Sequence, residues 1–267
     1  MIFTELLPLL GLTASLALGL VLLLWLISIP LRDVSIIDMA FSSIIWALVC
    51  IAWFSEGKPS GAPFLSVILI SIWALRMTVY LMRRNLGHGE DPRYSRLRGW
   101  VDEGWPFYIL SLRQVFLLQG VVIWLLILPQ LVLIKNGGDI GVLAVLGTVL
   151  WLTGFFFESV GDYQLSQFKA DNANKGKVLD TGLWRYTRHP NYFGELAQWW
   201  GLFLIALESP WAALGVIGPV MYSWLIIKVT GQATLDKKLT REKPEYSDYL
   251  SRTSGLIPMP PKSSSLK

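Results

Sequence analysis

The amino-acid sequence predicts an all-α, multi-pass membrane protein with about seven transmembrane helices. Its apolar residues come in runs of spanning length, and a span needs roughly 20 mostly apolar residues. The 267-residue chain is 53% hydrophobic and only 16% charged, whereas soluble domains have about 25% charged residues. The basic residues also gather in alternate loops between the runs, as in membrane proteins.

Seven apolar segments follow one another along the chain. We expect spans at about Leu6–Ile29, Val34–Phe54, Pro63–Met82, Pro106–Ile134, Ile140–Ser159, Tyr192–Leu207 and Trp211–Ile227. The sixth segment is the shortest, and it can also lie partly in the membrane interface. Met1–Glu5 lacks a basic start and a small-residue cleavage site. The first segment is therefore expected to be a retained helix and not a signal peptide.

The distribution of basic residues predicts the orientation. With seven spans, 18 of the 23 Lys and Arg residues fall in the loops after spans one, three and five and in the C-terminal tail. The opposite side has only Lys58 and Lys135. Basic loops stay in the cytoplasm, so we expect the N-terminus outside and the C-terminus inside, in a bacterial inner membrane or the endoplasmic reticulum. This bias also explains the net charge of +4, so no nucleic-acid partner is expected.

The segments between the spans complete the predicted organisation. Arg83–Trp105 and Gly161–Pro190 are expected to be long cytoplasmic loops, and Gly231–Tyr249 an amphipathic helix along the membrane surface. Residues 1–255 are predicted to form a single membrane-embedded domain. Residues 256–267 are rich in Pro and Ser, which predicts a flexible tail.

Ionisable residues at membrane depth are the first candidates for a site. They are Asp38, Arg76, Glu158, Asp162 and Glu195. Each costs on the order of 2.5–3.5 kcal/mol to insert, so such groups face one another or a cavity. They are either structural ion pairs and snorkelling groups or the lining of a polar pocket, and their number favours the pocket. Glu195 lies one helical turn beyond Asn191, so the two are expected to share a face.

The segment Gly182–Glu195 carries the strongest chemical signal. Arg185, Arg188 and His189 precede Pro190, which is typical of a helix start. Basic side chains beside free backbone N–H groups suit a phosphate group. An interfacial anchor of basic and aromatic residues is the equally open alternative. Arg83 and Arg84 are either phosphate-binding or simply basic because they lie in a cytoplasmic loop.

Other kinds of site are not indicated. The two histidines lie in separate segments and the single cysteine, Cys50, lies inside a span, so no metal site or disulfide is expected. The sequence has no dinucleotide-binding glycine motif, P-loop or nucleophile elbow.

Taken together, these motifs resemble a known family. Gly182–Glu195 resembles the C-terminal signature of the steroid 5-alpha-reductase superfamily, and it looks most similar to the DUF1295 branch. Further matches are Asp38 in its Ser-Ile-Ile-Asp context, Asp91-Pro92-Arg93-Tyr94, Glu158-x-x-x-Asp162-x-Gln164, and Pro244-x-Tyr246-x-x-Tyr249. The resemblance covers about Asp33–Pro261, with the reductase C-terminal-like region at about 110–261. The Arg-His-Pro-Asn-Tyr core alone is also similar to isoprenylcysteine and phospholipid methyltransferases.

The resemblance implies a reductase that uses NADPH in a cavity open to the cytoplasm. Hydride would pass to a carbon–carbon double bond conjugated to a ketone, in a steroid-like or other lipid. Asn191 and Glu195 match residues that contact the nicotinamide. With the basic candidates above, the predicted cofactor-binding residues are Arg76, Tyr80, Arg83, Arg84, Glu158, Asp162, Lys177, Arg185, Arg188, His189, Asn191, Tyr192, Glu195 and Lys228.

The predicted catalytic residues are Asp38, Trp73 and Glu195. Asp38, if burial keeps it protonated, is expected to hydrogen-bond the substrate carbonyl. Trp73 stands where the reductases have a proton-donating tyrosine, and an indole N–H is a poor acid. Farther along, Gln232 and Asp236 replace a histidine and a tyrosine of the family.

Two alternatives remain. The first is a membrane methyltransferase using S-adenosylmethionine, although Leu235-Asp236-Lys237 departs from the Glu-Glu pair of those enzymes. The second is a non-catalytic lipid-binding protein on the same fold, for which Trp73 is the argument. The expected partners are membrane lipids and a lipid or steroid-like substrate, and the expected state is a monomer.

Overall fold

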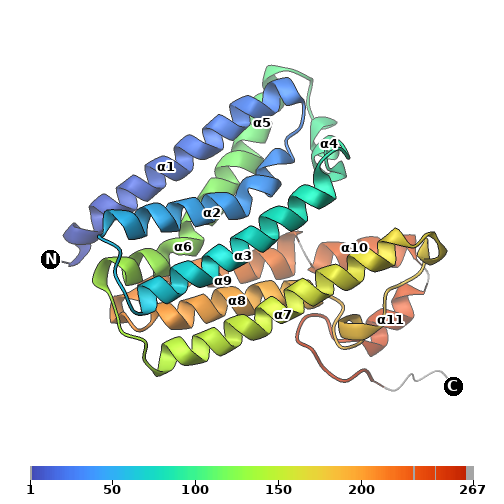
Figure 1. Cartoon of the computed structure of the whole chain (residues 1–267). Coiled ribbons are helices and arrows are strands. Elements are labelled where there is room, and N and C mark those ends of the chain that lie inside the picture. The colour runs from blue at the N-terminus through green and yellow to red at the C-terminus, as the bar shows by residue number, and fades with distance from the viewer. Residues whose placement is uncertain (1, 231, 244, 263–267) are drawn as a thin grey trace. The chain divides into compact units, whose positions relative to one another are not determined.

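The computed structural model describes residues 2–230, 232–243 and 245–262, which are largely helical and contain no strand. The predicted all-α class is confirmed. In chain order, the main elements of Figure 1 are α1 (Ile2–Leu31), α2 (Ile36–Ser55), α3 (Ala62–Asn85), α4 (Pro92–Arg98), α5 (Trp105–Ser111), α6 (Leu118–Asn136), α7 (Val142–Ala170), α8 (Pro190–Ala206), α9 (Ile217–Trp224), α10 (Gln232–Glu242) and α11 (Tyr246–Arg252). Shorter elements join them: η1 (Leu112–Leu117), η2 (Asn172–Asn174), η3 (Gly182–Arg185), η4 (Pro210–Val216) and η5 (Leu225–Thr230).

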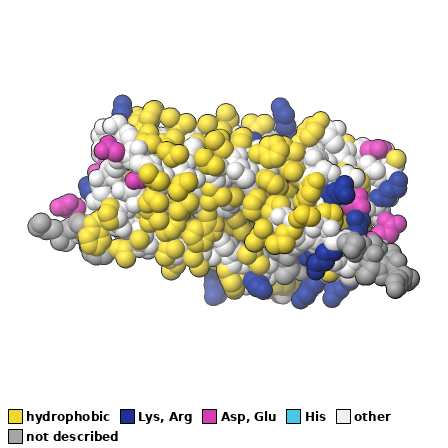
Figure 2. Space-filling view, turned by 90° about the horizontal axis from the view of Figure 1, so that it is seen from below, with side chains coloured by type: hydrophobic (Ala, Val, Ile, Leu, Met, Phe, Trp, Pro, Cys, Tyr) yellow, Lys and Arg dark blue, Asp and Glu magenta, His cyan; other side chains and the backbone are white. Residues whose placement is uncertain are grey.

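Six stretches are long and apolar enough to cross a membrane, which confirms a multi-pass protein. They are Thr4–Leu31, Ile36–Ser55, Ala62–Asn85, Trp105–Asn136, Val142–Ala170 and Pro210–Val229. The predicted sixth segment forms α8, which has only 17 residues. Exposed hydrophobic side chains such as Leu75 and Val142 suit contact with lipid, and Figure 2 shows broad apolar areas on one face. The sides on which the termini lie stay a prediction.

The chain forms two compact units, each described here by itself. Unit 1 comprises Met1–Ala144 and Ala206–Gly218, and unit 2 comprises Val145–Ile205 and Pro219–Lys267. In unit 1, α2 packs against α1, α3 and α6, and η4 packs on α6. The core includes the fully buried Ile45, Leu48 and Ile123. A Cβ at Gly215 would lie 2.7 Å from the backbone nitrogen of Pro129, so a glycine is needed where η4 meets α6.

Unit 2 is organised around a close contact between α7 and α8. Glycines recur every seven residues at Gly147, Gly154 and Gly161 of α7 and at Gly194 and Gly201 of α8, which places each set on one helix face. A Cβ at Gly154 would lie 2.5 Å from the carbonyl oxygen of Gly194, and one at Gly147 would lie 2.5 Å from that of Gly201. Small residues let helix backbones approach closely in membranes, so polar side chains on these faces are brought into contact.

The structure corrects several predicted boundaries. Gly161–Ala170, predicted as the start of a loop, continues α7, because a helix can extend past the point where its sequence stops being apolar. The predicted Arg83–Trp105 loop contains α4, which Asp91 caps by accepting a hydrogen bond from the backbone of Arg93. The predicted surface helix over Gly231–Tyr249 is two helices, α10 and α11. Gly231, Pro244 and residues 263–267 of the predicted tail lie outside the described residues.

Candidate functional site

Two polar pairs join α7 to α8 in unit 2. The amide of Gln198 donates to the carboxylate of Glu158 at 2.8 Å, and the amide of Asn191 donates to Asp162 at 3.2 Å. Glu158 and Gln198 are each 1% exposed, and Asp162 is 4% exposed. The glycine contacts hold the helices close enough for these bonds. Glu158, Asp162 and Asn191, which the sequence singled out, therefore do lie together.

Glu195 lies on the same helix and contacts a residue that the sequence analysis missed. The phenol of Tyr222, on α9, donates a hydrogen bond to its carboxylate. The Tyr222 ring also meets the ring of Trp199 edge-on, with centroids 6.2 Å apart. A buried tyrosine hydroxyl usually finds a polar partner. The sequence contained one indication of this contact, because Tyr222 is the single tyrosine of the largely apolar Trp211–Ile227 segment.

Two polar atoms in this region have no hydrogen-bond partner among the described residues. They are the amide oxygen of Gln198 and the hydroxyl oxygen of Ser159, the latter directly after Glu158 in α7. A buried polar group left unpaired costs about 1–3 kcal/mol. The region thus offers one acceptor and one hydroxyl to a polar ligand.

Arg188 and His189 both hydrogen-bond to the carboxylate of Asp236. Asp236 of α10 accepts hydrogen bonds from Arg188 at 2.9 Å, from His189 at 3.0 Å and from Tyr246 at 2.5 Å. The Arg188 guanidinium also donates to the carbonyls of Leu250 and Thr253, and Arg188 and His189 are buried. The predicted phosphate-binding role of this pair is therefore not favoured. The reason is that the guanidinium of Arg188 already pairs with the carboxylate of Asp236.

The titration of Asp236 reflects these contacts. Burial alone would raise the pKa of Asp236, but hydrogen bonds from His189, Arg188 and Tyr246 outweigh it and hold the pKa well below its usual range. The same network raises the pKa of Tyr246, through burial and through the hydrogen bond to Asp236. An anionic Asp236 is thus the centre of a structural network, at a position where the resemblance aligns a tyrosine of the family.

The C-terminal strap, residues 253–262, is hydrogen-bonded to the segment Gly182–Glu195. The backbone N–H of Arg188 donates to the carbonyl of Ser254, and that of Met259 donates to Tyr186, both at 2.9 Å. The Thr187 hydroxyl donates to the carbonyl of Leu256 at 2.9 Å. This part of the predicted tail is therefore hydrogen-bonded to unit 2 by its backbone.

The remaining candidates of unit 2 lie around this network. The ring of Tyr192 stacks on that of His189, with centroids 5.2 Å apart and an interplanar angle of 8°. Lys177, Arg185 and Lys228 are exposed. They differ from Arg188 in leaving their charge accessible to a ligand.

In unit 1, Asp38 accepts hydrogen bonds from three donors. These are Arg93 at 2.7 Å, Tyr94 at 2.8 Å and Gln119 at 3.0 Å. In these contacts Asp38 is a hydrogen-bond acceptor, whereas its expected role was to donate to a substrate carbonyl. Burial, together with the charge of Asp38, raises the pKa of Tyr94 well above its usual value. The group that carries a proton in this cluster is therefore Tyr94.

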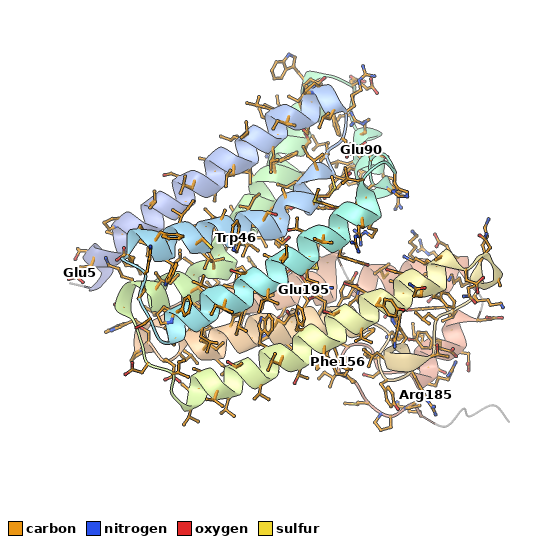
Figure 3. The ribbon with its side chains drawn as sticks, viewed as in Figure 1. Glu5, Trp46, Glu90, Phe156, Arg185 and Glu195 are labelled. Atoms are coloured by element: carbon orange, nitrogen blue, oxygen red, sulfur yellow. The ribbon has the colours of Figure 1, made fainter. Side chains whose placement is uncertain are left out.

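Helix α3 of unit 1 carries the other predicted residues. Trp73 is buried in the core. The Arg76 and Arg84 guanidinium groups lie 5.8 and 5.7 Å from the centroid of the Tyr80 ring, as cation–π contacts. Arg83 is exposed at the end of the helix. Arg76 and Tyr80, which are both predicted cofactor-binding residues, are therefore in contact. Figure 3 shows the side chains of both units, with Glu195 and Arg185 labelled in unit 2.

Comparison with known proteins identifies a family that this chain matches. The family described as "Protein of unknown function (DUF1295)" matches residues 24–253. An uncharacterised protein of Schizosaccharomyces pombe is 25% identical over 219 residues, which cover 71% of this chain and 61% of that protein. The rat 3-oxo-5-alpha-steroid 4-dehydrogenase 1 is 29% identical over 103 residues, which cover 39% of this chain and 34% of the rat protein.

The mouse protein of the same name is 32% identical over 71 residues, covering 27% of this chain and 26% of the mouse protein. The chain thus spans less than two thirds of the length of each of these relatives. No solved structure matches the chain.

Proposed function

Because the chain belongs to the DUF1295 branch of the steroid 5-alpha-reductase superfamily, we propose that it is an NADPH-dependent membrane reductase of a conjugated carbon–carbon double bond. The distant similarity to the two rodent enzymes suggests a reductase-type membrane enzyme. Their name describes the dehydrogenation of a 3-oxo steroid at carbon 4. Run in reverse, that reaction reduces a double bond conjugated to a ketone, which is the proposed chemistry in a lipid substrate.

The proposal rests on the polar strip between α7 and α8, formed by Glu158, Ser159, Asp162, Asn191 and Gln198, in which two polar atoms lack a hydrogen-bond partner among the described residues. The carboxamide of nicotinamide presents N–H donors and a carbonyl acceptor. The unpartnered amide oxygen of Gln198 and hydroxyl of Ser159 complement those groups. Asn191 and Glu195 lie on the same helix as Gln198, so the polar groups of this strip fit a nicotinamide carboxamide.

The chain's own residues then have distinct roles. NADPH supplies a hydride when it is bound. Glu195, held by Tyr222, accepts from the carboxamide, and Asn191, held by Asp162, orients the same end. Lys177 and Lys228 are exposed cations suited to the phosphates. Arg188 and His189 act indirectly. Their hydrogen bonds to Asp236 hold the segment that leads into α8.

The substrate-side roles are proposed for residues of unit 1. Tyr94 is proposed to hydrogen-bond the substrate carbonyl. Its O–H donates to the Asp38 carboxylate at 2.8 Å, and its raised pKa makes it a hydroxyl donor and not a strong acid. Asp38 positions Tyr94 and does not itself donate. This assignment supplies a hydroxyl donor to a protein in which Trp73 stands at the position of the family's tyrosine.

The proposal is tested by the nucleotide that the protein retains. The full chain, purified in detergent, is incubated with NADPH, NADH or S-adenosylmethionine, and bound molecules are counted by native mass spectrometry. We expect retention of NADPH in preference to NADH, and turnover of NADPH when a 3-oxo-4-ene steroid or a simpler lipid enone is added. Retention of S-adenosylmethionine instead, or of no nucleotide, would refute the reductase assignment.

A further inference from the structure

A pocket of about 460 Å³ lies in unit 2 beside the C-terminal strap. Three cationic residues, Arg185, Arg252 and Lys262, line it, together with a single acidic residue, Asp180. The proposed reduction does not use this pocket. Its lining brings together three separate parts of the chain: the η3 segment, the end of α11 and the last described residue of the strap.

One wall of the pocket is held firmly in place. The Arg252 guanidinium pairs with Asp180 at 2.6 Å and with Asp248 at 3.0 Å. The hydrogen bond to Asp180 raises the pKa of Arg252, so this side chain is charged at all physiological pH values. The backbone N–H of Lys262 donates to the carbonyl of Arg252 at 2.9 Å. The position of Lys262 is thereby tied to this ion-paired wall.

The other two cations keep their charge for a ligand. Both are exposed, and within the described ranges neither the Arg185 guanidinium nor the Lys262 ammonium makes a hydrogen bond or ion pair. The lining alone has a net charge of +2, from three cations and Asp180; counting Asp248, which also pairs with Arg252, the net charge is +1. Arginine and lysine in such an arrangement bind phosphate oxygens through charge-assisted hydrogen bonds.

Exposed aromatic and apolar residues occur in the same two segments as Arg185 and Lys262. Tyr186 directly follows Arg185 and is 43% exposed, while Ile257 and Met259 of the strap are 58% and 53% exposed. The hydrogen bond from the Met259 backbone to the Tyr186 carbonyl keeps two of these residues together. Tyrosine and basic residues are characteristic of the membrane interface. A lipid has an apolar part that can contact Tyr186, Ile257 and Met259, whereas a small soluble phosphate compound has none.

We propose that this pocket binds the phosphate headgroup of an anionic phospholipid, with Arg185 and Lys262 contacting the phosphate and Tyr186, Ile257 and Met259 contacting the lipid's apolar part. The charge fits, because anionic lipids attract basic residues near the membrane surface. Bound lipid would fasten the strap to the η3 segment. The inference is independent of the proposed reduction, since it concerns residues outside the α7–α8 strip.

The experiment measures the melting temperature of the detergent-purified full chain with added phosphatidylglycerol or phosphatidylcholine. A ligand at ten times its dissociation constant stabilises enough to raise the melting temperature by about 3 °C. We expect such a rise with phosphatidylglycerol and not with phosphatidylcholine. In the double variant Arg185→Gln, Lys262→Gln, the phosphatidylglycerol-specific rise should disappear. The double variant Lys237→Gln, Lys238→Gln removes two exposed charges from α10 and should keep it.

Other outcomes would overturn the proposal. One is an equal phosphatidylglycerol response in the pocket variant and the wild type. Another is a response to 2′,5′-ADP that the pocket variant loses while phosphatidylglycerol has no effect, because the pocket would then hold nucleotide phosphate. If the double variant does not fold, Lys262→Gln alone is used, and native mass spectrometry counts retained phosphatidylglycerol. The wild type should retain more than the variant.

Discussion

The phenol of Tyr222 donates a hydrogen bond to the carboxylate of Glu195, joining α9 to α8 inside unit 2. One oxygen of the acid that the resemblance assigns to the nicotinamide is thereby held by the protein itself. In the proposed reductase, Tyr222 is therefore a positioning residue for the cofactor.

Replacing Tyr222 with phenylalanine removes only this hydroxyl. We expect Tyr222→Phe to bind NADPH about tenfold more weakly, since a hydrogen bond to a charged group contributes about 1.5 kcal/mol or more. Affinity for 2′,5′-ADP, which has no nicotinamide, should not change. Tyr163→Phe, at an exposed position of α7, is the matched control. A parallel loss for both ligands would indicate a general structural role instead.

Asp236 is predicted to be important for stability and not for chemistry. Asp236→Asn leaves the buried Arg188 guanidinium without its anionic partner, and breaking a buried pair costs about 3 kcal/mol or more. The melting temperature should fall clearly. Glu242→Gln is the control, because Glu242 is exposed and its ammonium partner Lys238 lies 3.8 Å away. That change should alter stability by less than about 0.5 kcal/mol. Equal stability of the two variants would contradict the role given to Asp236.

The same carboxylate predicts a pH dependence. The pKa of Asp236 is lower in the folded protein than its ordinary value of 3.8, so the unfolded state takes up the proton first as the pH falls. The stabilisation is complete above about pH 4 and is lost below it. Between pH 6 and pH 3, the melting temperature of the wild type should therefore fall more steeply than that of Asp236→Asn. Parallel curves would show that Asp236 does not cause the loss.

The contact between α7 and α8 predicts intolerance of a methyl group. A Cβ at Gly154 would meet the carbonyl oxygen of Gly194 at 2.5 Å and the backbone nitrogen of Gln198 at 2.7 Å. Gly154→Ala should separate the helices, with a loss of about 1–3 kcal/mol and weaker NADPH binding. Gly19→Ala on α1, where no atom lies within 4 Å of the new Cβ, should be neutral or slightly stabilising. Thermal unfolding compares the two, and equal stability would argue against the contact.

The sequence predicted the apolar spans well, because hydrophobicity is a local property. The end of α7 was missed for the same reason: polarity marks where a span leaves the membrane, while the helix itself continues to Ala170. The seven-residue spacing of Gly147, Gly154 and Gly161 was readable in the sequence, but which helix it faces depends on the fold.

The site was predictable only in part. The resemblance pointed to Asp162 and Asn191, and the structure joins them. The basic residues before Pro190 also placed Arg188 among possible phosphate ligands, because its partner Asp236 is 48 residues away and only the folded chain brings them together. The three donors to Asp38 could not be foreseen for the same reason: Arg93, Tyr94 and Gln119 lie 55 to 81 residues away. Pairing at such separations has no local signal.

An equilibrium titration of the detergent-purified chain with NADPH, followed by nicotinamide fluorescence, tests the central claim most directly. The wild type and Thr153→Ala, an exposed change on α7, should bind NADPH with the same affinity and more tightly than NADH. Glu195→Ala and Asn191→Ala should each bind at least tenfold more weakly. NADPH affinity that is unchanged in both of these variants, or absent from the wild type, would contradict the account.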